Sequence, residues 1–155
     1  MLRHRWTPVV LVALALFVIN AVGRVVVWAA GLNGDDQMFM ASLYSMLAMA
    51  LVSGYAGFRW TRRYESVRVV GEVGFAIIVG GLLTTLVSPL FVGLDPFSGG
   101  PSIVLRQLGV CFAICALGAI VGALIVLAMG QDRRARAWKY QEQRLRAKPR
   151  RAAKR

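Results

Sequence analysis

The chain has 155 residues, of which 57% are hydrophobic, and its 19 basic and 7 acidic residues give it a formal charge of +12. A soluble domain is usually about 45–50% apolar. Here the excess is concentrated in four long runs, a pattern typical of membrane helices. The single histidine, His4, excludes a histidine-ligated haem, a His-rich metal site and a Ser-His-Asp catalytic set.

The first apolar run covers residues 7–31 and follows the basic residues Arg3 and Arg5. At about 1.5 Å per residue, a helix of this length crosses the roughly 30 Å of hydrocarbon in a bilayer. We therefore expect an uncleaved transmembrane helix. A cleaved signal peptide is the alternative, because a basic start, a short apolar stretch and small residues at Ala29 and Ala30 also fit one.

The second apolar run covers residues 38–58 and follows a short polar turn that contains Asp35 and Asp36. These acids fit a helix start. Small and hydroxyl residues are scattered through the run, and such residues let membrane helices approach closely. A basic connector, residues 59–68, separates it from the third run.

The third run, residues 69–92, carries a stripe of small residues on one face. The members of this stripe are Gly71, Gly74, Gly81, Thr85 and Ser88. We expect Gly74 and Gly81 in particular to serve helix packing. Pro89 is tolerated near the end of a membrane helix if neighbouring groups satisfy the freed carbonyl. A turn-rich loop, residues 93–102, follows.

The fourth run covers residues 103–129, with four small side chains along one face: Cys111, Cys115, Gly118 and Gly122. Gly118 and Gly122 form a GxxxG pair, which predicts packing within the chain, with a dimer face as the alternative. Helix geometry does not favour a disulfide between the two cysteines. We interpret them as small packing residues with no redox role.

The remaining segment, residues 131–155, holds eleven of the nineteen basic residues. Its first half contains helix formers and is expected to be partly helical. Pro149 and the density of charge predict disorder after about Ala147. The residues expected to contact anionic lipid or a cytosolic partner are Arg133, Arg134, Arg136, Trp138, Lys139 and Tyr140. Nucleic acid is disfavoured, because no fold presents these side chains in a groove.

The distribution of positive charge predicts the topology. The N-terminus, the 59–68 connector and the tail are basic, whereas the two remaining loops carry acids. We therefore expect an all-α integral membrane protein, an up-down-up-down bundle of four helices (residues 1–130) with both termini cytoplasmic and a basic cytoplasmic tail. The richness in Ala, Val, Gly and Arg suggests a bacterium, and so its cytoplasmic membrane.

Polar residues inside the apolar runs are the candidate site. Arg24 and Arg106 each lie about one turn inside a helix end on the outer side, and Asn20 lies one turn deeper than Arg24 on the same face. A buried arginine is costly unless it snorkels or finds a partner. The acids expected near the same membrane level are Asp35, Asp36 and Asp95.

These arginines admit three interpretations: snorkelling with ion pairing to the acids and lipid phosphates, an anion or lipid-headgroup site between the first and fourth helices, or docking onto another subunit. At the inner end, Glu72 follows Arg68 by four residues, which predicts an ion pair along the helix.

The sequence contains no catalytic set, no phosphate-binding glycine loop and no cofactor or metal motif. The first functional hypothesis is therefore a non-enzymatic accessory, assembly or scaffolding subunit of a larger bacterial membrane complex. Its partners would be anionic headgroups and other membrane subunits, or further copies of itself. The alternative is a small oligomeric transporter or channel for an anionic or lipidic solute, which uses Asn20, Arg24 and Arg106. A membrane enzyme acting on lipid is a third hypothesis.

Overall fold

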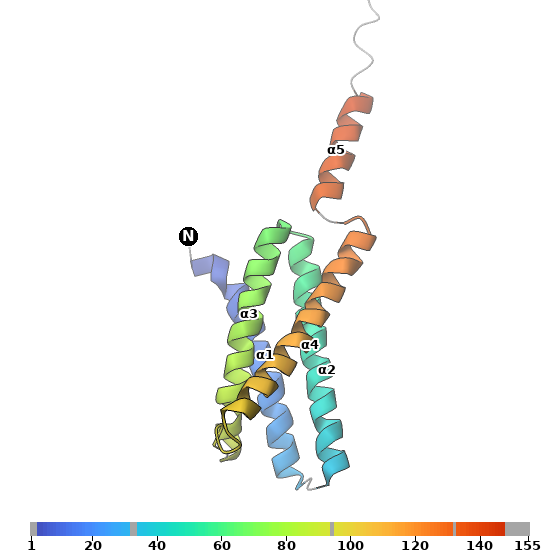
Figure 1. Ribbon diagram of the computed structural model, residues 1–155. Coiled ribbons are helices and arrows are strands. Elements are labelled where there is room, and N and C mark those ends of the chain that lie inside the picture. Colours follow the sequence, from blue (N-terminus) through green and yellow to red (C-terminus); the bar gives the residue numbers. More distant parts are fainter. Residues whose placement is uncertain (1–2, 32–33, 94, 132, 148–155) are drawn as a thin grey trace, which may run out of the picture.

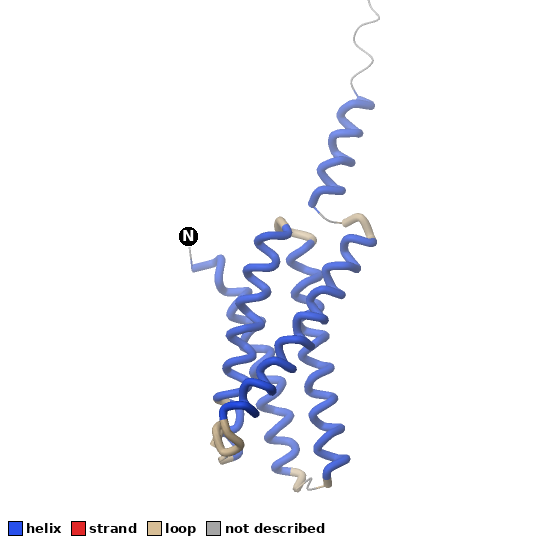
Figure 2. The backbone as a smooth tube through the Cα atoms, viewed as in Figure 1, coloured by secondary structure: helices blue, strands red, loops and turns tan. Residues whose placement is uncertain are grey.

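The computed structural model describes residues 3–31, 34–93, 95–131 and 133–147. This described part of the chain is helical and contains no strand. Its elements are α1 (Arg3–Ala29), α2 (Asp35–Thr61), α3 (Ser66–Leu86), a short 3-10 helix η1 (Ser88–Val92), α4 (Pro101–Ala128) and α5 (Arg133–Ala147). Short loops join the helices (Figure 2). The expected all-helical fold with four long apolar helices is confirmed.

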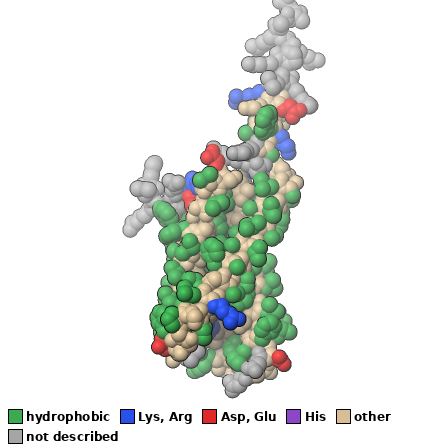
Figure 3. Space-filling view, in the orientation of Figure 1, with side chains coloured by type: hydrophobic (Ala, Val, Ile, Leu, Met, Phe, Trp, Pro, Cys, Tyr) green, Lys and Arg blue, Asp and Glu red, His purple; other side chains and the backbone are tan. Residues whose placement is uncertain are grey.

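Each of the helices α1 to α4 has the length and apolar composition needed to cross a membrane, which indicates a membrane protein. Large hydrophobic side chains are exposed along all four of them. Figure 3 shows these side chains covering the length of the bundle, with charged groups mostly toward its ends and on α5. An apolar surface of this extent is stable in lipid and not in water.

All eight ends of the four long helices differ from the predicted bounds, by one to six residues, and two of the C-terminal ends have a local reason. The third helix stops at Leu86 and continues as η1, because Pro89 lacks the N–H that an α-helix needs at that position. Gly93, with φ +71°, then ends η1. The fourth helix ends at Ala128, and Gly130, with φ +59°, separates it from α5. The segment after Ala147, predicted to be disordered, lies outside the described residues.

The four long helices pack most extensively in the pairs α2–α4 and α1–α3. The α1–α2 and α3–α4 connections lie at one end of the bundle, and the α2–α3 connection lies at the other (Figure 1). The core between the helices is built from residues of all four, among them Leu16, Met49, Ile77 and Cys115.

Glycines allow the backbones of α2 and α4 to touch. A Cβ atom added to Gly122 would overlap the carbonyl oxygen of Gly54, and one added to Gly118 would overlap the carbonyl oxygen of Ala50. The GxxxG pair of α4 is therefore used for packing within the chain. In α3, by contrast, a Cβ added to Gly74 would have no neighbour within 4 Å.

The small-residue stripe of α3 packs in its second half. A Cβ added to Gly81 would lie 3.4 Å from Leu108 of α4, an ordinary van der Waals contact. Thr85 and Ser88 are buried. Gly71 is exposed, and a Cβ there would have no neighbour within 4 Å.

We predict that Gly122→Ala lowers the stability of the bundle, because the new methyl group meets the backbone of α2 and not a movable side chain. Overpacking of this kind costs about 1–3 kcal/mol. The thermal midpoint of the purified protein in dodecyl maltoside measures the effect. The matched control is Gly109→Ala on the same helix, where a Cβ has no neighbour within 4 Å and the midpoint should stay or rise. Equal midpoints for the two variants would contradict close packing at Gly122.

Candidate functional site

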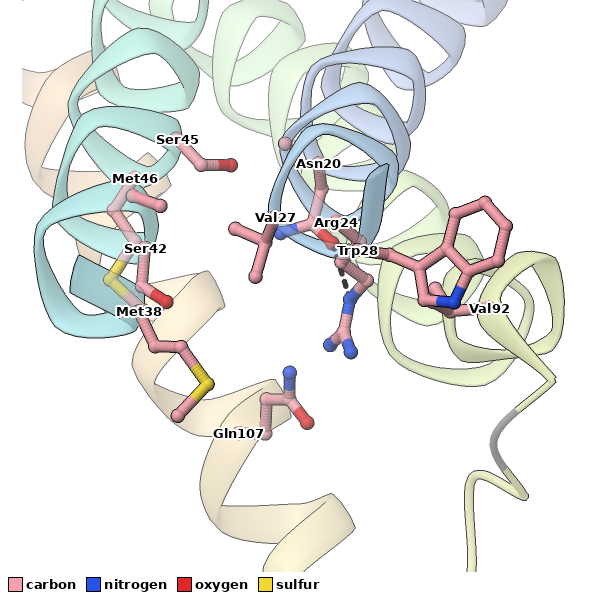
Figure 4. A pocket seen from close by; sticks show the side chains of 12 residues that line it. Asn20, Arg24, Val27, Trp28, Met38, Ser42, Ser45, Met46, Val92 and Gln107 are labelled. Carbon is pink, nitrogen blue, oxygen red and sulfur yellow. Dashed lines mark hydrogen bonds between the residues drawn. The ribbon is translucent and has the colours of Figure 1, made fainter. Parts of the chain in front are cut away.

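A cavity of about 560 Å³ lies between α1, α2 and α4, toward the end of the bundle that carries the α1–α2 connection. The second half of α1 and the first half of α2 form two of its walls, and α4 contributes Gln107 (Figure 4). Its polar side chains are Asn20, Arg24, Ser42, Ser45 and Gln107, and its larger apolar ones are Val27, Trp28, Met38, Met46 and Val92.

Asn20 holds the arginine of this cavity in place. The Nε of Arg24 donates a hydrogen bond to Asn20 Oδ1 at 3.1 Å, across one turn of α1. The same oxygen accepts a hydrogen bond from Ser88 Oγ at 2.8 Å. Ser88 is fully buried at the start of η1. A single amide oxygen therefore links α1 to the segment that follows α3 and fixes the direction of the guanidinium group.

The terminal nitrogens of Arg24 face the cavity. Figure 4 shows them directed toward Gln107 on the opposite wall. Among the described residues, Arg24 has Asn20 as its one side-chain hydrogen-bond partner and forms no ion pair. None of the described residues that line the cavity carries a carboxylate. A cation without a counter-charge is costly in a low-dielectric site, so a guanidinium group in this position is suited to bind an anionic group.

A smaller cavity of about 30 Å³ continues from Asn20 and Gln107 toward the middle of the bundle. Thr84 and the two cysteines of α4 line it. Thr84 is 2% exposed, and its hydroxyl has no hydrogen-bond partner, whereas the neighbouring Thr85 donates to Gly81 O at 2.8 Å. The Ser45 hydroxyl, on the wall of the larger cavity, is also buried without a partner.

The structure does not bring Arg106 together with Arg24. Arg106 is exposed and lies outside the cavity, and the next residue of α4, Gln107, lines it instead. Successive side chains on a helix point about 100° apart, so only one of the two faces α1. Sequence reasoning missed Gln107, although an amide within an apolar helix is the same signal that singled out Asn20.

The acids expected beside the arginines form no ion pair with them in the described part of the chain. Asp95 accepts a hydrogen bond from the backbone N–H of Phe97 at 3.0 Å. Asp36 is exposed. The side chain of Asp35 lies outside the described residues. None of the acids whose side chains are described therefore pairs with Arg24.

A second polar cluster lies at the other end of the bundle. The Arg68 Nε donates to Glu72 Oε1 at 2.6 Å, which is the ion pair expected from their spacing. The indole N–H of Trp60, a residue only 5% exposed, donates to the other carboxylate oxygen at 2.8 Å. The guanidinium of Arg68 also lies over the ring of Tyr64, 4.0 Å from its centroid. This cluster ties α2 to α3 and is a packing device.

The basic segment after α4 forms the helix α5. Arg136 donates hydrogen bonds to the carbonyl oxygens of Gln131 and Arg62. Trp138 and Tyr140 are 73% and 69% exposed, and Lys139 is exposed as well. The side chains of the first two basic residues, Arg133 and Arg134, lie outside the described residues.

The described residues contain no group of three or more His, Cys, Asp and Glu side chains that could hold a metal ion. Cys111 and Cys115 are buried free thiols. Comparison of the chain with protein-family models, curated proteins and solved structures finds no match.

We predict that Thr84→Val raises the thermal midpoint, because it removes a buried hydroxyl without a partner and keeps the shape of the side chain. The expected gain is about 1 kcal/mol. Thr85→Val is the matched control. It removes a hydroxyl that is hydrogen-bonded to the backbone, and it should leave the midpoint unchanged or lower it. If both variants lost stability equally, the Thr84 hydroxyl would have a partner, such as a water molecule in the small cavity.

Proposed function

We propose that this protein is a small membrane transporter that binds an anionic organic solute in the cavity around Arg24. The observation that supports this function is a guanidinium group whose terminal nitrogens face a cavity of about 560 Å³, in which no described lining residue carries a carboxylate. Sites for small molecules have volumes of about 300–1,000 Å³, with mostly apolar walls and a few converging polar groups. The cavity has both properties.

The lining also indicates the chemistry of the solute. Arg24, Gln107 and the serines of α2 would bind a negatively charged, oxygen-rich head, since charge-assisted hydrogen bonds are worth about 1.5–3 kcal/mol each. Trp28 and the methionines of α2 would enclose an apolar body, and methionine adapts to different shapes. We therefore propose an amphiphilic organic anion as the solute class.

The proposed orientation follows the positive charge. The basic α2–α3 connection and the basic tail would face the cytoplasm of a bacterium, with both termini inside and an up-down-up-down bundle. The cavity would then open toward the outer face of the cytoplasmic membrane. Beyond Asn20 lies the smaller cavity of about 30 Å³, which is lined by Thr84 and Cys115. Transport would require the helices to separate at this layer.

We predict that Arg24→Gln weakens binding of decanesulfonate, a permanently charged amphiphile, by about tenfold or more, because it removes a charge-assisted hydrogen bond. The rise in thermal midpoint with decanesulfonate concentration measures binding in dodecyl maltoside. Uptake of the same probe into proteoliposomes measures transport. Arg106→Gln is the matched control, since it removes the same charge near the same level but outside the cavity.

Equal effects of the two variants would contradict a site at Arg24 and leave only a general attraction of anions. Binding without uptake would retain the site and contradict transport. Decanol lacks the charge. It should therefore raise the thermal midpoint of the unmodified protein by much less than decanesulfonate does. If decanol matched decanesulfonate, the cavity would select for the apolar chain alone.

A second candidate function is a non-enzymatic accessory subunit of a larger membrane complex. The observation that favours it is α5, which extends beyond the end of the four-helix bundle and exposes two aromatic rings among basic residues (Figure 1). Exposed aromatic and basic side chains are typical of protein interfaces. The partner would be an acidic surface of a cytosolic or membrane protein, with self-association as the other possibility.

For this candidate we predict that mild-detergent purification of the chromosomally tagged protein recovers other membrane proteins in fixed stoichiometry, measured by native mass spectrometry. The double variant Trp138→Ala/Tyr140→Ala should lose those proteins, because it removes the aromatic contacts of α5. A homo-oligomer without partners would contradict the accessory function. If the double variant lost the homo-oligomer, α5 would instead be assigned to self-association.

A further inference from the structure

A cationic hollow lies at the end of the bundle that carries the α2–α3 connection. The Arg24 cavity lies toward the opposite end. It has a volume of about 430 Å³ and is lined by Tyr55, Phe58, Arg59, Arg62, Arg63 and Arg136. Four guanidinium groups therefore border one small space, and none of its described lining residues carries a carboxylate. Arginine suits this position, because its fork of N–H donors matches the oxygens of a phosphate.

Neutral groups position these arginines and leave their charge in place. The Nη1 of Arg59 donates to the Tyr55 hydroxyl at 3.0 Å. The guanidinium of Arg62 lies over the Phe58 ring, 5.5 Å from its centroid. Within the described part of the chain, the Arg63 side chain forms no hydrogen bond or ion pair. The hollow therefore has N–H donors open to an anion.

An apolar groove of about 600 Å³ runs along the α2–α4 contact and meets this hollow. Tyr55 and Phe58 line both. The glycines that let α2 and α4 touch, among them Gly122, remove the side chains that would otherwise fill the groove. Leu117 and Val121 of α4 form part of its wall, and both are exposed to the surroundings of the bundle.

The two spaces together have the outline of a phospholipid. The apolar span of α2 ends at Thr61, so Arg62 and Arg63 lie at the membrane–water boundary and the groove lies within the hydrocarbon layer. We propose that they form one binding site for an anionic phospholipid, with the phosphate against the arginines and one acyl chain in the groove. The charge selects anionic over zwitterionic headgroups. This site does not depend on what the Arg24 cavity binds.

The test is native mass spectrometry of the full chain in dodecyl maltoside, titrated with dioleoyl phosphatidylglycerol or dioleoyl phosphatidylcholine. We expect one phosphatidylglycerol to bind about tenfold more tightly than phosphatidylcholine. The double variant Arg62→Gln/Arg63→Gln should remove this preference, since each basic residue near a surface contributes about a fivefold change. Val121→Trp, which fills the groove from an exposed position, should weaken binding of both lipids.

The control is Arg144→Glu, which lowers the net charge by the same two units at an exposed position of α5 outside the hollow. It should keep the preference for phosphatidylglycerol. Equal loss in the control and in Arg62→Gln/Arg63→Gln would overturn the site in favour of diffuse attraction. Displacement of phosphatidylglycerol by glycerol phosphate, with no effect of Val121→Trp, would assign a free-anion site. A lipid-independent dimer that Val121→Trp abolishes would assign the groove to a second copy of the chain.

Discussion

Inside a bilayer, polar groups have no water to bind, so a polar group without a partner within the protein is costly. Two acceptors meet this constraint at opposite ends of the bundle. The amide oxygen of Asn20 takes one hydrogen bond from Arg24 and one from Ser88. The carboxylate of Glu72 takes one from Arg68 and one from Trp60. Each acceptor joins two different helices, so the polar residues hold together helices whose apolar surfaces lipid would solvate equally well.

The contact between α2 and α4 has the opposite character, because it is made by backbone and small side chains. Gly54, Gly118 and Gly122 let the backbones of the two helices touch. The same missing side chains create the apolar groove on the outside of that contact. Toward the α1–α2 connection, larger side chains and Gln107 lie between α1, α2 and α4, and the cavity around Arg24 lies there. The bundle is thus closely packed where the glycines of α2 and α4 meet, and it contains a cavity near the α1–α2 connection.

The sequence was sufficient to predict the four long helices, because length and apolar composition alone determine them. The Asn20–Arg24 and Arg68–Glu72 pairs were also predictable, since both are contacts one helical turn apart. The contribution of Ser88 to Asn20 was not, because it depends on how α1 packs against η1, and no local pattern specifies that. The inclusion of Gln107 in place of Arg106 depends on the rotation of α4 about its axis, which a helix apolar on all sides does not encode.

The hydrogen bond between Ser88 and Asn20 spans 68 residues, and this separation bears on how the protein is made. The first helix enters the membrane long before the ribosome has synthesised the serine that will complete its polar pair. Until then, Asn20 and Arg24 can bond only to each other, and burying them in hydrocarbon is costly. A position of α1 near the headgroups or beside the insertion machinery would lower this cost. Once the third hydrophobic segment is present, Ser88 can bond to Asn20, and α1 would then move to its final depth. The final depth of the first helix in the membrane would then depend on translation of the third.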